Sequence, residues 1–124
     1  MRGYPWGEDW PPPKGAGNFA GEEAIDENWW YFLPVIEGYN DGYVRTSPMG
    51  GFAANRYGLY DMAGNACQWC DDWLDDRHLY RVVRGSSWCD ASPDDLRSSK
   101  IWINEAPVYR YSHRGFRCLV AQGN

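Results

Sequence analysis

The chain has 124 residues, which fits one domain, and it carries eight Trp and nine Tyr beside fourteen Gly and eight Pro. Its formal net charge is −5 and no dense run of Lys or Arg is present, so we expect no nucleic-acid partner. No apolar stretch reaches membrane-spanning length, and Met1 to Tyr4 do not begin a signal peptide, so we expect a soluble, by default cytoplasmic, domain without membrane insertion. The sequence leaves the compartment and the oligomeric state open.

The first thirty residues predict turns and no helix. Pro11-Pro12-Pro13 favours extended backbone, and Gly15-Ala16-Gly17 favours a flexible turn. Further along, Asn40-Asp41-Gly42 is a strong turn signal, because Asn and Gly both tolerate left-handed backbone. This part of the chain is therefore expected to consist of ordered loops.

Regular structure is expected in the second half. Residues 65–73 predict a strand in which Cys67 and Cys70 face opposite sides. Short strands are also predicted at 80–83, 101–103 and 116–120. A short helix is predicted at 92–99, because Ser92 suits the N-cap, Pro93 the first helical position, and the acids that follow the positive helix end.

Four cysteines stand at positions 67, 70, 89 and 118. That number permits two disulfides, a zinc site or reduced thiols. Cys67 and Cys70 cannot hold one ion together from opposite faces of a strand, and the other two lack zinc-finger spacing. Buried reduced thiols are the simplest interpretation.

Seven phrases occur in an order that resembles the formylglycine-generating-enzyme, or sulfatase-modifying-factor, family. They run from Tyr4 almost to the end and cover about the C-terminal half of that family's usual domain. The phrases are Tyr4-Pro5-Trp6-Gly7, Asn40-Asp41-Gly42-Tyr43, Thr46-Ser47-Pro48-Met49-Gly50-Gly51-Phe52, Asn55-Arg56-Tyr57-Gly58-Leu59-Tyr60-Asp61-Met62-Ala63-Gly64-Asn65, Arg84-Gly85-Ser86-Ser87-Trp88, Leu96-Arg97-Ser98-Ser99 and Arg114-Gly115-Phe116-Arg117-Cys118.

The resemblance implies a C-type-lectin-like fold. We therefore expect residues 1–124 to form a single domain, minimised or the C-terminal part of the family domain. Its class is α+β, irregular and loop-rich, with short antiparallel strands and one or two short helices. The loop-rich composition agrees with this expectation.

The resemblance also implies two structural calcium sites, whose oxygen ligands are of the type that Ca²⁺ prefers. The first comprises the side chains of Asn18 and Asp41 with the carbonyls of Phe19 and Tyr43. The second comprises the side chains of Asp61 and Gln68 with the carbonyls of Gly64 and Ala66. Gln68 departs from the family's usual Glu, which removes one negative charge and weakens the expected affinity.

Family members that make formylglycine use two cysteines and a copper ion. Aligned on Gly85-Ser86-Ser87-Trp88, those two positions here are Asp90 and Asp95, and Cys118 matches a structural cysteine. Carboxylates do not replace thiolates as Cu(I) ligands. We therefore expect no catalytic residue, no copper and no enzyme activity.

The segment from residue 88 to residue 114 combines fixed family phrases with residues of the adaptable types found at recognition surfaces. Tyr109, Tyr111 and Trp102 are expected to supply most binding energy, and Asp90, His113 and Arg114 selectivity. The whole expected ligand-binding set is Trp88, Cys89, Asp90, Ile101, Trp102, Ile103, Asn104, Val108, Tyr109, Tyr111, Ser112, His113 and Arg114.

This pattern resembles the variable proteins of diversity-generating retroelements, in which template adenines are mutated. An altered Asn codon yields Cys, Asp, Ile, Val, Tyr, Ser, His or Arg, and all eight occur at the expected positions. The leading hypothesis is therefore a non-catalytic module that binds a protein or cell-surface ligand. The alternatives are a sulfatase-modifying-factor-type oxidoreductase and an accessory structural domain of such an enzyme.

Arg97, Arg110 and Arg117 belong to the fixed phrases. Guanidinium groups recognise anions, but in a loop-rich domain they also pair with acids and satisfy loop carbonyls. The second role is the one that we expect.

Overall fold

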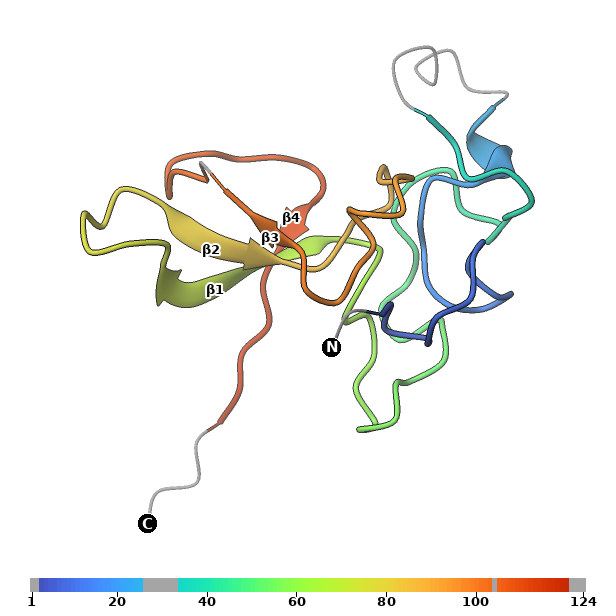
Figure 1. The fold of residues 1–124 in the computed structure, drawn as a ribbon, viewed down its shortest axis with the longest axis horizontal. Coiled ribbons are helices and arrows are strands. Elements are labelled where there is room, and N and C mark those ends of the chain that lie inside the picture. The colour runs from blue at the N-terminus through green and yellow to red at the C-terminus, as the bar shows by residue number, and fades with distance from the viewer. Residues whose placement is uncertain (1–2, 26–33, 104, 121–124) are drawn as a thin grey trace.

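The computed structural model describes residues 3–25, 34–103 and 105–120. One side of the molecule is a small sheet and the other is a set of long loops (Figure 1). The elements are the 3-10 helix η1 (Glu22–Ala24) and the strands β1 (Cys67–Trp73), β2 (Arg81–Arg84), β3 (Ile101–Trp102) and β4 (Arg114–Gly115). Strands and loops thus dominate, as expected, whereas helix is almost absent from the described residues.

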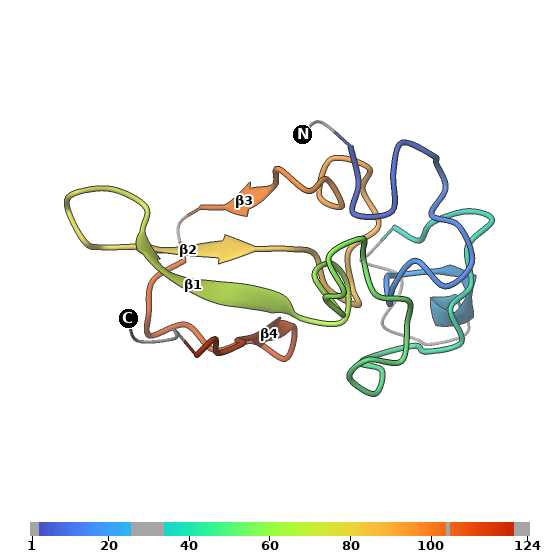
Figure 2. The same ribbon diagram turned by 90° about the horizontal axis from the view of Figure 1, so that it is seen from below.

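The four strands lie in the order β3-β2-β1-β4 (Figure 2). β1 pairs antiparallel with β2 and β2 antiparallel with β3, with Val83 opposite both Trp69 and Trp102. β4 pairs with β1 in parallel, which differs from the all-antiparallel expectation. The connection between β3 and β4 therefore carries the chain from one edge of the sheet to the other.

Three of the four strand predictions are confirmed within one or two residues, at β1, β2 and β3. The strand predicted at 116–120 is wrong, since the structure forms β4 just before it. A strand needs a neighbouring backbone to bond its amides and carbonyls. Here a side chain connects the segment to the rest of the protein instead, since Arg117 donates to Gln68 Oε1 and to the Tyr60 carbonyl, both at 2.6 Å.

The helix predicted at 92–99 is also wrong, because the segment forms successive turns. The amides of Asp95 and Leu96 both bond the Ser92 carbonyl, at 3.0 and 3.2 Å, which starts one turn. The Ser98 amide then bonds the Gly3 carbonyl at 3.0 Å rather than a carbonyl of its own segment. A tertiary hydrogen bond and the burial of Leu96 thus outweigh local helix signals. The 3-10 helix η1 forms where none was expected.

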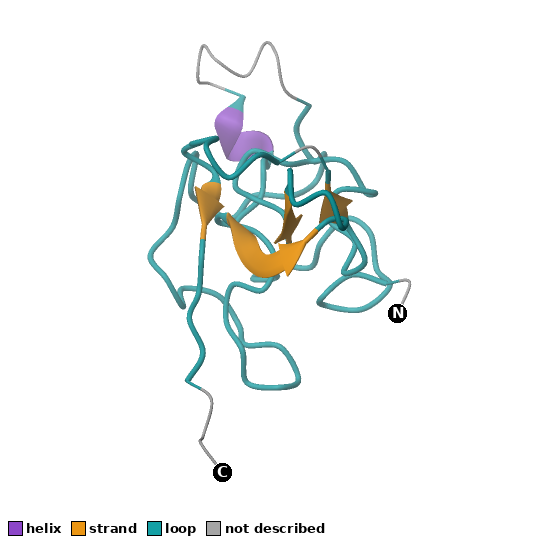
Figure 3. Ribbon diagram, turned by 90° about the vertical axis from the view of Figure 1, so that its left-hand side faces the viewer, coloured by secondary structure: helices purple, strands orange, loops and turns teal. Residues whose placement is uncertain are grey.

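The hydrophobic core lies among the loops rather than under the sheet. Phe19, Ile36, Tyr39 and Leu96 are buried together, although they come from segments far apart in the sequence. The Tyr39 hydroxyl donates to the Gly17 carbonyl at 2.5 Å, which satisfies the polar end of that ring. Loops surround the sheet on several sides (Figure 3), so aromatic packing and side-chain hydrogen bonds hold much of this fold.

All four cysteines are free thiols in the structure. Cys67 is buried, Cys70 and Cys89 are half-buried and Cys118 is exposed. The expectation of buried thiols is therefore met fully by Cys67 and not by Cys118. No group of three or more His, Cys, Asp or Glu side chains in the described part of the chain is arranged to hold a metal ion. The same residues include no helix long and apolar enough to cross a membrane.

Candidate functional site

Five exposed apolar side chains lie on β3 and on the connection that follows it. Ile103 and Val108 are 62% and 78% exposed, and Tyr109 and Tyr111 are 45% and 46% exposed. Two of the five, Tyr109 and Tyr111, are in ring contact, and the others lie close to them in the sequence. Exposed apolar surface is typical of interaction sites where it gathers. We call this set the β3–β4 patch, and its members are Ile101, Ile103, Val108, Tyr109 and Tyr111.

Aromatic rings continue from the patch along the connection. The Tyr109 and Tyr111 ring centroids lie 6.0 Å apart in an edge-on arrangement, and Tyr111 stacks on His113 at 5.2 Å. Burial lowers the pKa of the His113 imidazole, and the neighbouring Arg114 lowers it further. The row is thus held in one geometry by its own ring contacts, which reduces the entropy lost on binding.

A buried ion pair supports this row from beneath. The Arg114 guanidinium bonds Glu105 Oε1 at 2.7 Å, and the two side chains are only 7% and 10% exposed. The guanidinium carbon also lies 5.4 Å from the Trp102 ring centroid and 5.5 Å from the Tyr111 ring centroid. Arg114, expected to face the ligand, therefore anchors the patch instead.

Trp102 is likewise a support and not a free anchor. Its Nε1 donates to the Gly85 carbonyl at 2.7 Å, and the Lys100 ammonium lies 4.4 Å from the ring centroid. Of the three side chains expected to supply binding energy, the structure presents the two tyrosines and holds Trp102 in place.

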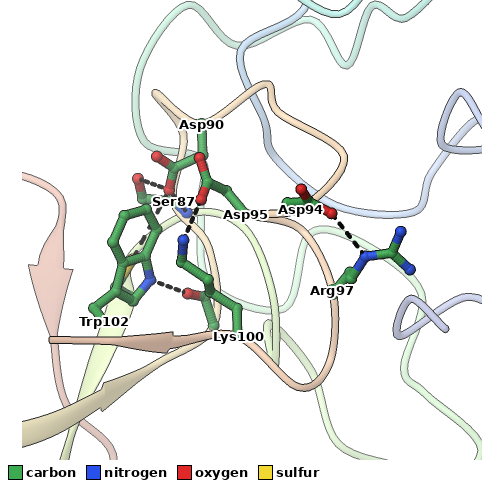
Figure 4. Close-up of polar contacts among 9 residues, drawn as sticks. Ser87, Asp90, Asp94, Asp95, Arg97, Lys100 and Trp102 are labelled. Carbon is green, nitrogen blue, oxygen red and sulfur yellow. Dashed lines mark hydrogen bonds and ion pairs between the residues drawn. The ribbon is translucent and has the colours of Figure 1, made fainter. Parts of the chain in front are cut away.

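Asp90 and Asp95, which the resemblance aligns with two catalytic cysteines, lie near each other (Figure 4). Asp90 Oδ2 accepts from the Ser87 amide and hydroxyl, both at 2.7 Å, and Asp95 pairs with Lys100. Burial raises the pKa of Asp90, although the bonds from Ser87 act against the rise. Both carboxylates are therefore engaged by the protein itself.

Two thiols border the same cluster. Cys89 Sγ lies 3.3 Å from Ser87 Oγ, and Cys67 Sγ lies 3.9 Å from Asp90 Oδ2. Burial raises the pKa of Cys67 to about 12, and the charge of Asp90 adds to the rise. Burial raises the pKa of Cys89 too. Asp90 and Asp95, which stand where the resemblance places the two cysteines, offer hard carboxylate oxygens in place of soft thiolates. The cluster therefore does not fit the copper that the family's catalysis requires.

The residues of the first expected calcium site fit a hard cation. Asn18 is 1% exposed, and its Oδ1 has no hydrogen-bond partner among the described residues. The adjacent Phe19 amide and the Tyr43 amide donate to the two oxygens of Asp41, at 2.8 and 2.9 Å. Burial raises the pKa of Asp41 to about 6, although the bonds from these two amides act against the rise. A buried amide oxygen without a partner, one residue before the amide that bonds the half-buried Asp41 carboxylate, is a suitable start for Ca²⁺ coordination.

The second expected calcium site is arranged differently. The Asp61 carboxylate accepts from the Gly50 amide at 2.7 Å, and Gln68 Oε1 accepts from Arg117 Nε at 2.6 Å. Gln68 Nε2 donates to the Asp61 carbonyl at 2.6 Å. A guanidinium thus bonds the amide oxygen that calcium would use, and calcium binding here stays a prediction that requires displacing Arg117. The carbonyls expected to assist belong to Gly64 and Ala66.

The remaining expected residues fall into two groups. Trp88 and Ser112 line one cavity, while Asn104 lies outside the described residues. Glu105 is the functional residue that the sequence did not reveal, because nothing in its spacing marks it as the partner of Arg114. Two of the fixed-phrase arginines behave as expected: Arg97 pairs with Asp94 at 3.0 Å, and Arg117 donates to a loop carbonyl.

Comparison with known proteins places this arrangement in a family. The profile of the sulfatase-modifying factor enzyme 1-like domain matches residues 1–122. A formylglycine-generating enzyme of Thermomonospora curvata is 40% identical over 93% of this chain and 42% of its own length. A bovine relative named inactive Cα-formylglycine-generating enzyme 2 is 29% identical over 97% of this chain and 38% of its own.

A solved structure adds a further likeness. Treponema denticola variable protein 1 superposes with a TM-score of 0.53 and 35% identity, over 64% of this chain and 33% of its own. The chain thus spans less than half the length of each of these relatives. It is a domain of the class that contains both formylglycine-generating enzymes and a variable protein. The chain belongs to the sulfatase-modifying factor enzyme 1-like family.

Proposed function

We propose that this chain is a non-catalytic binding module on a C-type-lectin-like scaffold, and that the β3–β4 patch contacts a protein or cell-surface ligand. The observation that carries the proposal is the exposure of five apolar side chains along one segment, with Tyr111 held next to the buried Glu105–Arg114 pair. Tyr109 and Tyr111 would act as anchors, because tyrosines lose little conformational entropy and bury much area on contact. His113 would add polar selectivity at the end of the row.

The absence of catalysis is part of the same proposal. Asp90 and Asp95 occupy the catalytic cysteine positions and are bonded to Ser87 and Lys100. The likeness to a variable protein and the existence of an inactive relative both support a binding role. The alternative, an oxidoreductase or an accessory part of one, draws on the relatives named as formylglycine-generating enzymes.

Calcium is proposed at the first site only. Asn18 and Asp41 would hold the ion with the carbonyls of Phe19 and Tyr43, and its charge would offset that of the half-buried Asp41 carboxylate. The site lies among the loops, so the ion would stabilise them.

An array of extracellular proteins and glycans, probed with the labelled chain, tests the binding role. Wild type is compared with Tyr111→Ser and with Tyr57→Ser, whose 66% exposed ring lies in a different loop. A ligand that loses at least about ten-fold affinity with Tyr111→Ser, but not with Tyr57→Ser, supports the proposal. Equal binding by all three proteins contradicts it.

The diversification part of the proposal has a separate test. The gene for this chain is compared with its neighbourhood for a near-identical repeat beside a reverse transcriptase gene. Mismatches confined to template adenines, at codons of residues 88–114, are the expected result. Mismatches spread over all bases and codons would mean ordinary divergence.

A further inference from the structure

An open cavity of about 390 Å³ lies beside the aromatic row. Its lining is Arg45, Thr46, Trp88 and Ser112. The volume falls within the range of small-ligand sites. Trp88 and Ser112 come from the expected recognition segment, whereas Arg45 and Thr46 come from a loop more than forty residues earlier. A second cavity, near Pro5 and Phe52, has only about 100 Å³ and offers no cationic side chain.

The buried residue Asn65 joins two of the loops that line the larger cavity. Asn65 Oδ1 accepts from the Ser47 amide at 3.0 Å, and its Nδ2 donates to the Ser47 carbonyl at 3.1 Å. The main-chain carbonyl of Asn65 accepts from the Trp88 amide at 3.1 Å. Asn65 thus ties the loop of Arg45 and Thr46 to the loop of Trp88.

Two further bonds complete this frame. Asn18 Nδ2 donates to the Arg45 carbonyl at 2.7 Å. On the opposite wall, the Cys67 amide bonds the carbonyl of His113, the residue after Ser112, at 2.9 Å. The backbone around the cavity is therefore preorganised, and only exposed side chains would adjust on binding.

The lining has a distinct charge. The whole chain has seventeen acidic and twelve basic residues, yet the cavity is lined by one guanidinium and no carboxylate. Arg45 is exposed, and none of the ion pairs that the structure gives for residues 3–25, 34–103 and 105–120 involves it. The hydroxyls of Thr46 and Ser112 add donors, and the Trp88 indole adds a flat apolar wall.

We propose that the cavity of Arg45, Thr46, Trp88 and Ser112 binds an oxyanion carried on an apolar or aromatic body. A planar guanidinium matches carboxylate and phosphate oxygens with paired hydrogen bonds, and an indole packs against the attached apolar group. The inference rests on the proposed function and deepens it, since it gives the ligand of the β3–β4 patch an anionic group. It also makes Arg45 a specificity-determining residue outside the 88–114 segment.

The test uses three small probes of similar shape: benzoate, phenyl phosphate and the neutral benzamide. Their binding to the full chain is measured by NMR titration. Wild type should bind at least one of the two anions about ten-fold tighter than benzamide, because only an anion pairs with the guanidinium. The tighter of the two anions identifies a carboxylate or a phosphate as the preferred group.

Arg45→Gln should reduce that anion's affinity at least about ten-fold. Arg77→Gln is the matched control, because Arg77 is exposed, lies in the β1–β2 connection and should leave binding unchanged. Equal affinity for benzamide and both anions, or an unchanged anion affinity in Arg45→Gln, would overturn the inference. Folding of each variant is checked by its melting temperature.

The outcome is separable from that of the proposed function. If the anions fail to bind but Tyr111→Ser still loses its macromolecular ligand, the cavity inference fails and the binding role stands. If Arg45→Gln loses the anions while Tyr111→Ser changes nothing, the cavity is real and the β3–β4 patch is not the recognition surface.

Discussion

Removing the charge of Glu105 should destabilise the protein far more than removing an exposed acid. Glu105 and Arg114 are buried almost completely and bond at 2.7 Å, so Glu105→Gln leaves a guanidinium without a counter-charge in the interior. Breaking a buried pair in this way costs about 3 to 5 kcal/mol of unfolding free energy. With an unfolding entropy of about 2.1 cal/mol/K per residue, this lowers the Tm by roughly 10 to 20 °C.

The structure also limits what the intact pair contributes. Glu105 Oε2 and Arg114 Nε are buried without hydrogen-bond partners among the described residues, which subtracts from the pair's net contribution. Replacing both residues, as in Glu105→Leu with Arg114→Met, should therefore recover stability to within about 1 kcal/mol of wild type. The contrast between the single and double variants isolates the uncompensated charge.

Urea unfolding followed by circular dichroism measures these differences. Asp75→Asn is the control, because Asp75 and Arg77 also pair closely, at 2.6 Å, but with the arginine 72% exposed. Solvent screens an exposed pair, so we expect Asp75→Asn to change the stability little. If Glu105→Gln costs as little as Asp75→Asn, the reasoning about a buried support beneath the aromatic row is refuted.

Without calcium, the free energy of unfolding should rise as the pH falls from about 6 to about 4. The pKa of Asp41 is raised to about 6 in the folded chain, so the folded chain binds a proton more tightly than the unfolded chain. Solvent screening limits this gain to about 1 to 2 kcal/mol. Ca²⁺ at pH 7 should raise the Tm of wild type but not the Tm of Asp41→Asn. Equal Tm shifts in the two proteins would contradict the calcium site. Cys118 should react with a thiol reagent within the mixing time at pH 8. Cys67 should react only on unfolding, since it is buried and its pKa is raised to about 12. Mass spectrometry locates the label, and fast labelling of Cys67 would contradict its burial. Leu96→Ala should lower the free energy of unfolding in urea by about 2 to 5 kcal/mol, because Leu96 is 1% exposed in the core. A loss below about 1 kcal/mol would show that Leu96 is not packed in the core as described.

The sequence predicted well those features that depend on local pattern. The alternation around Cys67 and Trp69 placed β1, and the turn residues around Asp41 placed the loop whose carboxylate bonds two amides. The exposed tyrosines at 109 and 111 also follow from residue type, since adaptable aromatics between fixed phrases indicate contact surface. In each case the sequence pattern and the structural feature that it predicts lie within a few residues of each other.

Features that depend on distant partners were missed. The Ser98 amide bonds Gly3, and this long-range contact ended the predicted helix. Arg114 carries the same side chain whether it faces a ligand or Glu105, and no spacing rule distinguishes the two. The cavity is similar, because Asn65 bonds both Ser47, in the loop of Arg45, and Trp88, and these residues lie far apart in the sequence. Tertiary competition of this kind is invisible to a pattern search.

The central claim is that carboxylates at positions 90 and 95 leave this scaffold without the thiolate pair that redox copper requires. The most direct measurement is Cu(I) titration of the purified chain against a competing chelator, with an aerobic assay for oxidation of a cysteine-containing peptide by mass spectrometry. We predict no stoichiometric high-affinity copper and no loss of the peptide thiol to an aldehyde. One tightly bound copper per chain together with aldehyde formation would contradict the account.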